Sequence, residues 1–232
     1  MTVNHLIRIL PKLVKYNLKI IFAGKFVWFI LAALFFFGLF MFRAAWDRAE
    51  ITEELIYTLL LFPSMLLVFY PSVFGIQNDQ DARILELLFG IPNYKYKVWV
   101  VRLMMIYVAL FFILILFSCF AVVMLYPVNQ LEMSFQLMFP ILFYGNLAFM
   151  FSTMTRSGNG TAVIMIGIAI VIIIFQRDTY WNVLLNPFAS PRDMPPFIWD
   201  GIILKNRALL LVASIVWMMS GLFYLQKREK FI

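Results

Sequence analysis

Three acidic residues and one arginine lie close together between two long apolar runs: Asp79, Asp81, Arg83 and Glu86. Paired carboxylates are ligands that Mg²⁺ accepts, and they also serve in acid and base catalysis. At helical spacing, Asp79, Arg83 and Glu86 fall at i, i+4 and i+7 and share one face. Charges interleaved with leucines at this spacing favour a surface that docks onto another protein over a cation site.

The sequence lacks the residues that several other kinds of catalytic site require. The single histidine, His5, excludes an HExxH zinc site and a Ser-His-Asp triad. No GxxxxGK[ST] loop is present to bind nucleotide phosphates, and the single cysteine, Cys119, excludes an internal disulfide framework. The apolar runs hold no carboxylate, although proton-coupled carriers usually place one there. A transport protein of this composition therefore needs its energy from another chain.

The acidic group belongs to a predicted short amphipathic helix. Leu85 and Leu88 fall on a different face from the charges. Asn78 is expected to cap the start of this helix, and Gly90 with Pro92 is expected to end it after about three turns. Basic residues then lead into the next apolar run, namely Lys95, Lys97 and Arg102. This pattern predicts a helix at the membrane surface with an apolar side against the membrane domain.

The composition places the chain in a membrane. Of its 232 residues, 64% are hydrophobic and only 13% are charged, whereas about a quarter of residues are charged in soluble domains. The net charge of +7 does not indicate nucleic-acid binding, because the basic residues flank apolar runs instead of forming one patch. The sequence predicts an all-α integral membrane protein with a single transmembrane domain over residues 1–232.

Six apolar runs are expected to cross the bilayer and to form a bundle over residues 26–225. A bilayer core needs roughly 20 apolar residues, so the fifth run is short for a span. The six runs are Phe26–Phe42, Leu55–Ile76, Leu103–Leu125, Met133–Met154, Thr161–Phe175 and Ala208–Leu225.

A basic amphipathic segment precedes the first run. Arg8, Lys12, Lys15 and Lys19 share one helical face, which predicts an interfacial elbow helix over residues 1–25 that contacts lipid or a partner. A basic tail follows the last run at residues 226–232. Most of the basic residues lie in these two segments, in the polar stretch 78–102 and at Arg156, so the positive-inside rule places all four in the cytoplasm. The protein is expected to be a multi-pass protein of a plasma or bacterial inner membrane with both termini cytoplasmic.

A few polar side chains fall inside the predicted spans. Pro63 and Pro71 are expected to bend the second span, which then either lines a flexible pathway or is a statically bent helix. Asn146, in the fourth span, is expected to form hydrogen bonds between helices. The residues predicted as possible pathway lining are Tyr57, Ser64, Tyr70 and Asn146.

Two further connections are predicted to have a role. The polar loop 152–160, with Arg156 at its centre, forms a second cytoplasmic surface for a partner. In the long connection 176–207, the apolar segments Trp181–Phe188 and Phe197–Leu204 are expected either to re-enter the outer leaflet or to lie on its surface.

The segment around Asp79 resembles the first cytoplasmic loop of ABC-2-type transporter permeases. Asp79 and Asp81 stand at the acidic positions of that loop, residues 85–88 form its Leu-Glu-Leu-Leu core, and Pro92 is its proline. The sequence departs from the pattern at residues 83–84, where Arg-Ile replaces the usual Gly-Thr. The resemblance implies a coupling helix that contacts a separate ATPase. The predicted coupling site combines residues of this helix with Arg156 of the second cytoplasmic loop: Asp79, Asp81, Arg83, Glu86, Leu87 and Arg156.

The same resemblance implies the partners and the activity. The chain would pair with a second copy or a paralogue and with two ABC ATPase subunits, which carry the ATP and Mg²⁺, and would itself bind no cofactor and catalyse no reaction. Exported substrates in this family include lipids, glycans, peptides and drugs. Two alternatives stay open at this point: a membrane-embedded lipid-modifying enzyme that uses the cytoplasmic acids, and a non-catalytic assembly subunit.

Overall fold

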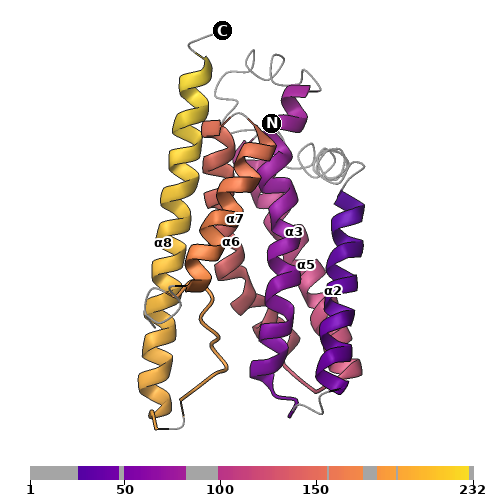
Figure 1. Cartoon of the computed structure of the whole chain (residues 1–232). Helices are drawn as coiled ribbons and strands as arrows, with labels where there is room; N and C mark the ends of the chain where they lie inside the picture. The colour runs from indigo at the N-terminus through magenta and orange to yellow at the C-terminus, as the bar shows by residue number, and fades with distance from the viewer. Residues whose placement is uncertain are drawn as a thin grey trace, which may run out of the picture.

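The protein is a bundle of antiparallel α-helices (Figure 1). The computed structural model describes residues 26–46, 50–81, 99–155, 157–174, 182–191 and 193–229, with side chains as far as Gln77 in the second helix and Leu225 in the last. The helices in these residues are α2 (Phe26–Trp46), α3 (Glu53–Asp81), α5 (Val101–Met124), α6 (Gln130–Thr155), α7 (Gly158–Ile174) and α8 (Pro196–Glu229).

The predicted all-α membrane fold agrees with this architecture. Each predicted apolar run coincides with one helix, because an uninterrupted apolar sequence must satisfy its own backbone hydrogen bonds in lipid. Five helices, α2, α3, α5, α6 and α8, are long and apolar enough to cross a membrane. The remaining helix, α7, is apolar but has only 17 residues, which gives it a length of about 25 Å against a bilayer core of about 30 Å.

The helices alternate in direction along the bundle. The first residue of α2, the last residue of α3, the first residue of α5 and the last residue of α8 share one end (Figure 1). The opposite end carries exposed acidic residues and is called the acidic end here. Its residues of this kind are Glu50, Glu53, Glu54, Glu132, Asp193 and Asp200.

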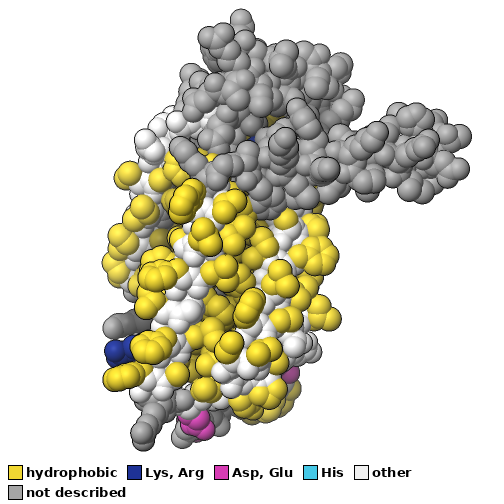
Figure 2. Space-filling model, turned by 90° about the vertical axis from the view of Figure 1, so that its right-hand side faces the viewer, with side chains coloured by type: hydrophobic (Ala, Val, Ile, Leu, Met, Phe, Trp, Pro, Cys, Tyr) yellow, Lys and Arg dark blue, Asp and Glu magenta, His cyan; other side chains and the backbone are white. Residues whose placement is uncertain are grey.

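Apolar side chains cover most of the described part of the face that Figure 2 shows. Trp46, Val123 and Phe197 are each more than 70% exposed. A surface of this kind would aggregate in water but is the ordinary surface of a protein in lipid. In Figure 2 acidic side chains appear only toward the lower end of this face.

Helix α6 lies at the centre and packs against α3, α5, α7 and α8. Small residues permit the closest of these contacts. A Cβ atom on Gly221 of α8 would lie 2.7 Å from the Phe149 ring of α6 and 3.3 Å from the Met150 Cα atom, and one on Gly145 of α6 would lie 2.7 Å from the Tyr107 hydroxyl of α5. Such small-residue contacts let helix backbones approach closely inside a membrane.

Part of the long connection before α8 differs from a simple surface loop. Residues 182–191, called the extended segment here, form neither helix nor strand and include turns at 183–184 and 187–188. They run along the bundle toward the acidic end, beyond the point where α7 stops (Figure 1). Val183 and Leu185 of this segment are buried. The segment 182–188 therefore packs against the helices. Whether it lies within the outer leaflet stays a prediction.

Two local predictions were wrong. The segment Phe197–Leu204 is not a separate re-entrant or surface element, because it forms the first turns of the continuous helix α8. Pro195 and Pro196 lie at the start of α8, where proline is compatible with a helix, and no helix breaker separates them from Leu204. Asn78 does not cap a new helix, because α3 continues without a break to Asp81.

Three predicted features lie wholly or mostly outside the described residues: the elbow helix at 1–25, the surface helix that begins at Asn78 and ends near Gly90, and Arg156.

Candidate functional site

The non-acidic end of α3 is joined to the turn between α6 and α7. The backbone N–H of Gly158 donates a hydrogen bond to Gln77 Oε1. The Ser152 hydroxyl of α6 donates to the Val73 carbonyl of α3 at 3.0 Å. A Cβ on Gly158 would overlap both Gln77 Oε1 and the Phe74 ring, so the absence of a side chain at Gly158 permits this contact. The two segments predicted to meet a partner therefore have flanking helices that contact each other directly.

The turn itself is tighter than the predicted polar loop 152–160. Helix α6 continues to Thr155 and α7 begins at Gly158. Ser157 caps α7, because its hydroxyl accepts the N–H of Gly160 at 3.2 Å. The Thr155 and Thr161 hydroxyls lie 2.7 Å apart and close the turn between the two helices. These hydrogen bonds fix the position of α7 relative to α6.

The predicted coupling residues are only partly described. Asp79 and Asp81 belong to the last turn of α3, so this helix leads directly into the motif. The other four predicted residues of this site lie outside the described residues: Arg83, Glu86, Leu87 and Arg156.

Asn146 connects three helices in the middle of the bundle. Its Oδ1 accepts a hydrogen bond from the Tyr107 hydroxyl of α5 at 2.7 Å, and its Nδ2 donates to Ser214 Oγ of α8 at 2.7 Å. Ser214 donates in turn to the Leu142 carbonyl at 3.0 Å. Asn146 is 4% exposed, and the interhelical hydrogen bonding predicted for it is confirmed.

The other predicted pathway residues are also buried inside the chain. Ser64 is fully buried and donates to the Leu60 carbonyl of its own helix. The Tyr70 ring packs between the phenylalanines of α2 and Phe74, with 4.8 Å between the Tyr70 and Phe29 ring centroids. Tyr57 is fully buried, and its ring lies 5.9 Å from the Phe188 ring. None of these side chains lines the cavities described below, and a pathway role for them stays a prediction.

A buried arginine near the acidic end was missed by the sequence analysis. Arg207 of α8 is 4% exposed, and neutral groups accept its hydrogen bonds. Its Nε donates to Gln136 Oε1 at 3.0 Å, and one Nη donates to the Leu185 carbonyl at 3.1 Å and to the Tyr57 hydroxyl at 3.3 Å. The other Nη donates to Asn206 Oδ1 at 3.3 Å.

Arg207 and its neighbours hold the extended segment in place. Leu185 is anchored by Arg207, and the Asn182 carbonyl accepts Asn206 Nδ2 at 3.0 Å. Asn186 Nδ2 donates to the Glu54 carbonyl of α3 at 2.8 Å. Backbone without regular structure is stable inside a membrane protein only where protein groups satisfy it. The sequence signal was the pair Asn206-Arg207 at the start of an otherwise apolar run.

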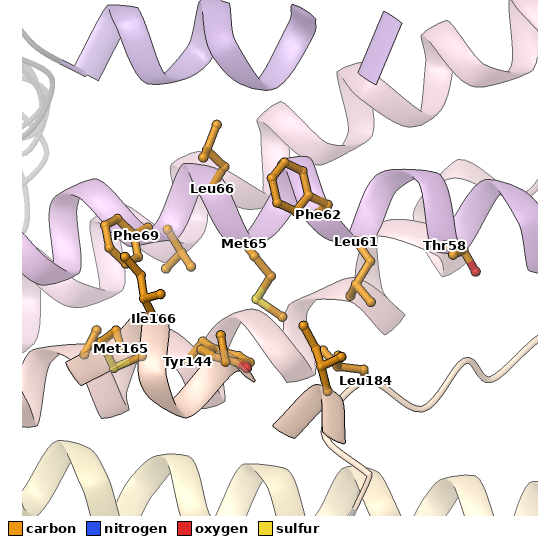
Figure 3. Close-up of a pocket in the computed structure, with 14 residues that line it drawn as sticks. Thr58, Leu61, Phe62, Met65, Leu66, Phe69, Tyr144, Met165, Ile166 and Leu184 are labelled. Atoms are coloured by element: carbon orange, nitrogen blue, oxygen red, sulfur yellow. The ribbon is translucent and has the colours of Figure 1, made fainter. Parts of the chain in front are cut away.

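An apolar groove of about 450 Å³ separates α3 from α7 along part of their length (Figure 3). In Figure 3, Leu61 and Met65 of α3 face Tyr144 of α6, and Leu184 of the extended segment lies beside them. The other labelled lining residues are Thr58, Phe62, Leu66, Phe69, Met165 and Ile166. Among the described residues, Thr58 and Tyr144 supply the polar side-chain groups that line the groove.

Among the described residues, no group of three or more His, Cys, Asp or Glu side chains could hold a metal ion. Comparison of the chain with protein-family models, curated proteins and solved structures finds no match.

Proposed function

We propose that this chain is the membrane-spanning permease subunit of an ABC exporter, with six crossings and with ATP hydrolysis on separate partner subunits. The observation that carries the proposal is the course of α3. This helix runs without a break from the acidic end to Asp81, where the motif that resembles a coupling loop begins. It also contacts α2, α5, α6 and α7, so a force applied at Asp79 and Asp81 reaches most of the bundle.

The junction between α3 and the α6–α7 turn supports this mechanism. Because Gln77 and Val73 are hydrogen-bonded to Gly158 and Ser152, a partner that contacts Asp81 and Arg156 pushes on one joined unit. Closure of an ATPase dimer would then move the end of α3 together with the start of α7. Movements of this type are rigid-body displacements of packed helices.

The groove between α3 and α7 supports a second copy or a paralogue as the other half of the pathway. Its apolar wall is open on one side, and one subunit alone does not enclose it. If a second subunit covered this groove, the two subunits together would enclose an apolar route. Such a route suits an amphipathic or lipid-like substrate. Two predicted pathway residues, Tyr57 and Ser64, are buried on α3 and do not line the groove. In this proposal they act on the route by fixing the position of α3.

The distribution of charge supports the predicted orientation. The exposed carboxylates of the described residues gather at the acidic end. In the sequence, the basic stretches before Phe26, before Leu103 and after Leu225 adjoin helix ends that lie at the other end. Under the positive-inside rule, the acidic end is extracellular and the end of α3 at Asp81 is cytoplasmic.

The test is to purify the protein from its native membrane and to compare two charge reversals. Glu86→Lys should reduce the recovery of a co-purified ATPase chain and its ATP hydrolysis, since it reverses a charge on the docking face. Glu54→Lys is the matched control, because Glu54 is exposed at the acidic end and should change neither. If no chain with a nucleotide-binding loop is recovered with the wild-type protein, or if both variants behave alike, the proposal fails.

A further inference from the structure

A second cavity, of about 330 Å³, opens at the acidic end between α6, α8 and the extended segment. Its wall combines one cation, Arg207, with two carboxylates, Glu132 and Asp200, and with the rings of Phe135, Phe139 and Phe188. The volume falls at the lower limit of small-molecule sites. This cavity is separate from the apolar groove and has no residue in common with it.

The three charged groups of this cavity lack counter-ions within the described residues. Arg207 donates only to neutral oxygen atoms of Gln136, Tyr57, Asn206 and Leu185. A guanidinium has five N–H donors, so one N–H of Arg207 has no acceptor in the part of the chain that the structure describes. Glu132 and Asp200 are exposed, and their carboxylates form no ion pair or hydrogen bond with a described residue.

A buried cation held by neutral acceptors favours an anion that supplies its missing charge. Arginine binds phosphate well because its planar donors match the phosphate oxygens. The two carboxylates on the same wall would repel a simple anion, but they would attract an ammonium group carried by the same ligand. The cavity is therefore complementary to a zwitterion that has a phosphate and an amine close together.

Exposed apolar side chains at the mouth of the cavity indicate that the zwitterion is the headgroup of a membrane lipid. Leu204 is 71% exposed and Phe135 is 55% exposed, so both are placed to contact lipid tails. We propose that the cavity binds the headgroup of a phospholipid with a primary amine, such as phosphatidylethanolamine, with the phosphate at Arg207 and the ammonium at Glu132 and Asp200. The bound lipid would cover the extended segment at residues 187–188 and stabilise it. This site does not depend on ATPase coupling.

The experiment measures lipid retention by native mass spectrometry on the full chain in detergent. Phosphatidylethanolamine, phosphatidylcholine and phosphatidylglycerol with identical tails are added in turn. Phosphatidylethanolamine should be retained about tenfold more than the other two, since its ammonium can donate hydrogen bonds to carboxylates. Equal retention of the three lipids overturns the proposal.

Two double variants locate the site. Glu132→Gln with Asp200→Asn should abolish the preference for phosphatidylethanolamine while leaving the packing of the chain unchanged, because both side chains are exposed. Glu53→Gln with Glu54→Gln removes the same charge at the same end, outside the cavity, and should preserve the preference. If the first variant retains the preference, the site is not this cavity. Free phosphoethanolamine that binds as tightly as the lipid would overturn the membrane source in favour of a soluble zwitterion.

Discussion

The two interfaces on either side of α6 are built in opposite ways. Toward α8, backbones approach closely at Gly221, and polar bonds join the helices at Asn146 and Arg207. Between α3 and α7, close contact centres on the junction at Gly158, and beyond it an apolar groove separates these two helices. In a membrane, apolar side chains gain little by leaving lipid for protein, so close packing and hydrogen bonds give a fixed interface. The α6–α8 side is thus fixed, and the α3–α7 side is free to adapt.

The largest expected effect in this comparison comes from Arg207→Leu. This change leaves the Leu185 carbonyl and the Gln136 and Tyr57 side chains without their partner, and should lower the free energy of unfolding by about 3 kcal/mol. Lys205→Leu is the matched control, because Lys205 is exposed two residues earlier on α8. Thermal unfolding in detergent measures both. Equal midpoints for the two variants would contradict the fixed role of Arg207.

Gly221→Ala compared with Gly167→Ala tests close packing on the two sides. The added methyl of Gly221→Ala meets the Phe149 ring and the Met150 backbone, and should cost about 1–3 kcal/mol. The same methyl at position 167 of α7 meets nothing within 4 Å, and should be neutral or slightly stabilising because alanine favours helix. Similar losses in both variants would remove the distinction between the interfaces.

Asn146→Leu tests the polar contribution to the fixed side. Hydrogen bonds between helices in membranes contribute about 0.6 kcal/mol on average, with a maximum near 1.7 kcal/mol. A double-mutant cycle with Tyr107→Phe should give a coupling energy in this range, since the two side chains share one hydrogen bond. A coupling energy of zero would mean that the bond does not stabilise the α5–α6 contact.

The smallest effect is expected at the groove. Ile166→Ala should change the free energy of unfolding by less than about 0.5 kcal/mol, because Ile166 is 55% exposed. The neighbouring Met165 is 2% exposed and packs in a cluster with Val73 and Leu147. Met165→Ala should therefore lower the free energy of unfolding by about 2 kcal/mol. Equal losses at positions 165 and 166 would show that the groove is closed by packing within one chain.

The helices were predictable from the sequence, and their mutual contacts were largely not. Long apolar runs locate the helices because lipid requires every backbone group to be paired within the helix. The end of α3 was misplaced because the run becomes polar at Gln77, yet the residues through Asp81 contain no proline or glycine that would end a helix. Polarity marked the end of the apolar surface and not the end of the helix.

The candidate sites depend on contacts between residues far apart in the chain. Asn146 was assigned correctly because an amide inside an apolar run needs a partner on another helix. The groove depends on how α3 and α7 are rotated relative to each other, which no local pattern specifies. Arg207 forms hydrogen bonds with Tyr57, which lies 150 positions away in the sequence, and with Leu185, which lies 22 positions away. Arg207 was counted with the basic residues that flank spans, because the neighbouring Asn206 was the only sign in the sequence that set it apart.

The length of α8 has a consequence for recognition of the protein from outside the lipid. Its 34 residues extend for about 50 Å, whereas a whole bilayer with its headgroups measures about 40–45 Å. The excess of about 5–10 Å corresponds to roughly one or two helical turns. The first turn of α8, with the exposed Phe197, would therefore project past the headgroups as rigid helix, while Asp200 lies at headgroup level and Leu204 below it. An antibody fragment raised against the folded protein would find there a conformational epitope that a linear peptide of the same residues does not reproduce.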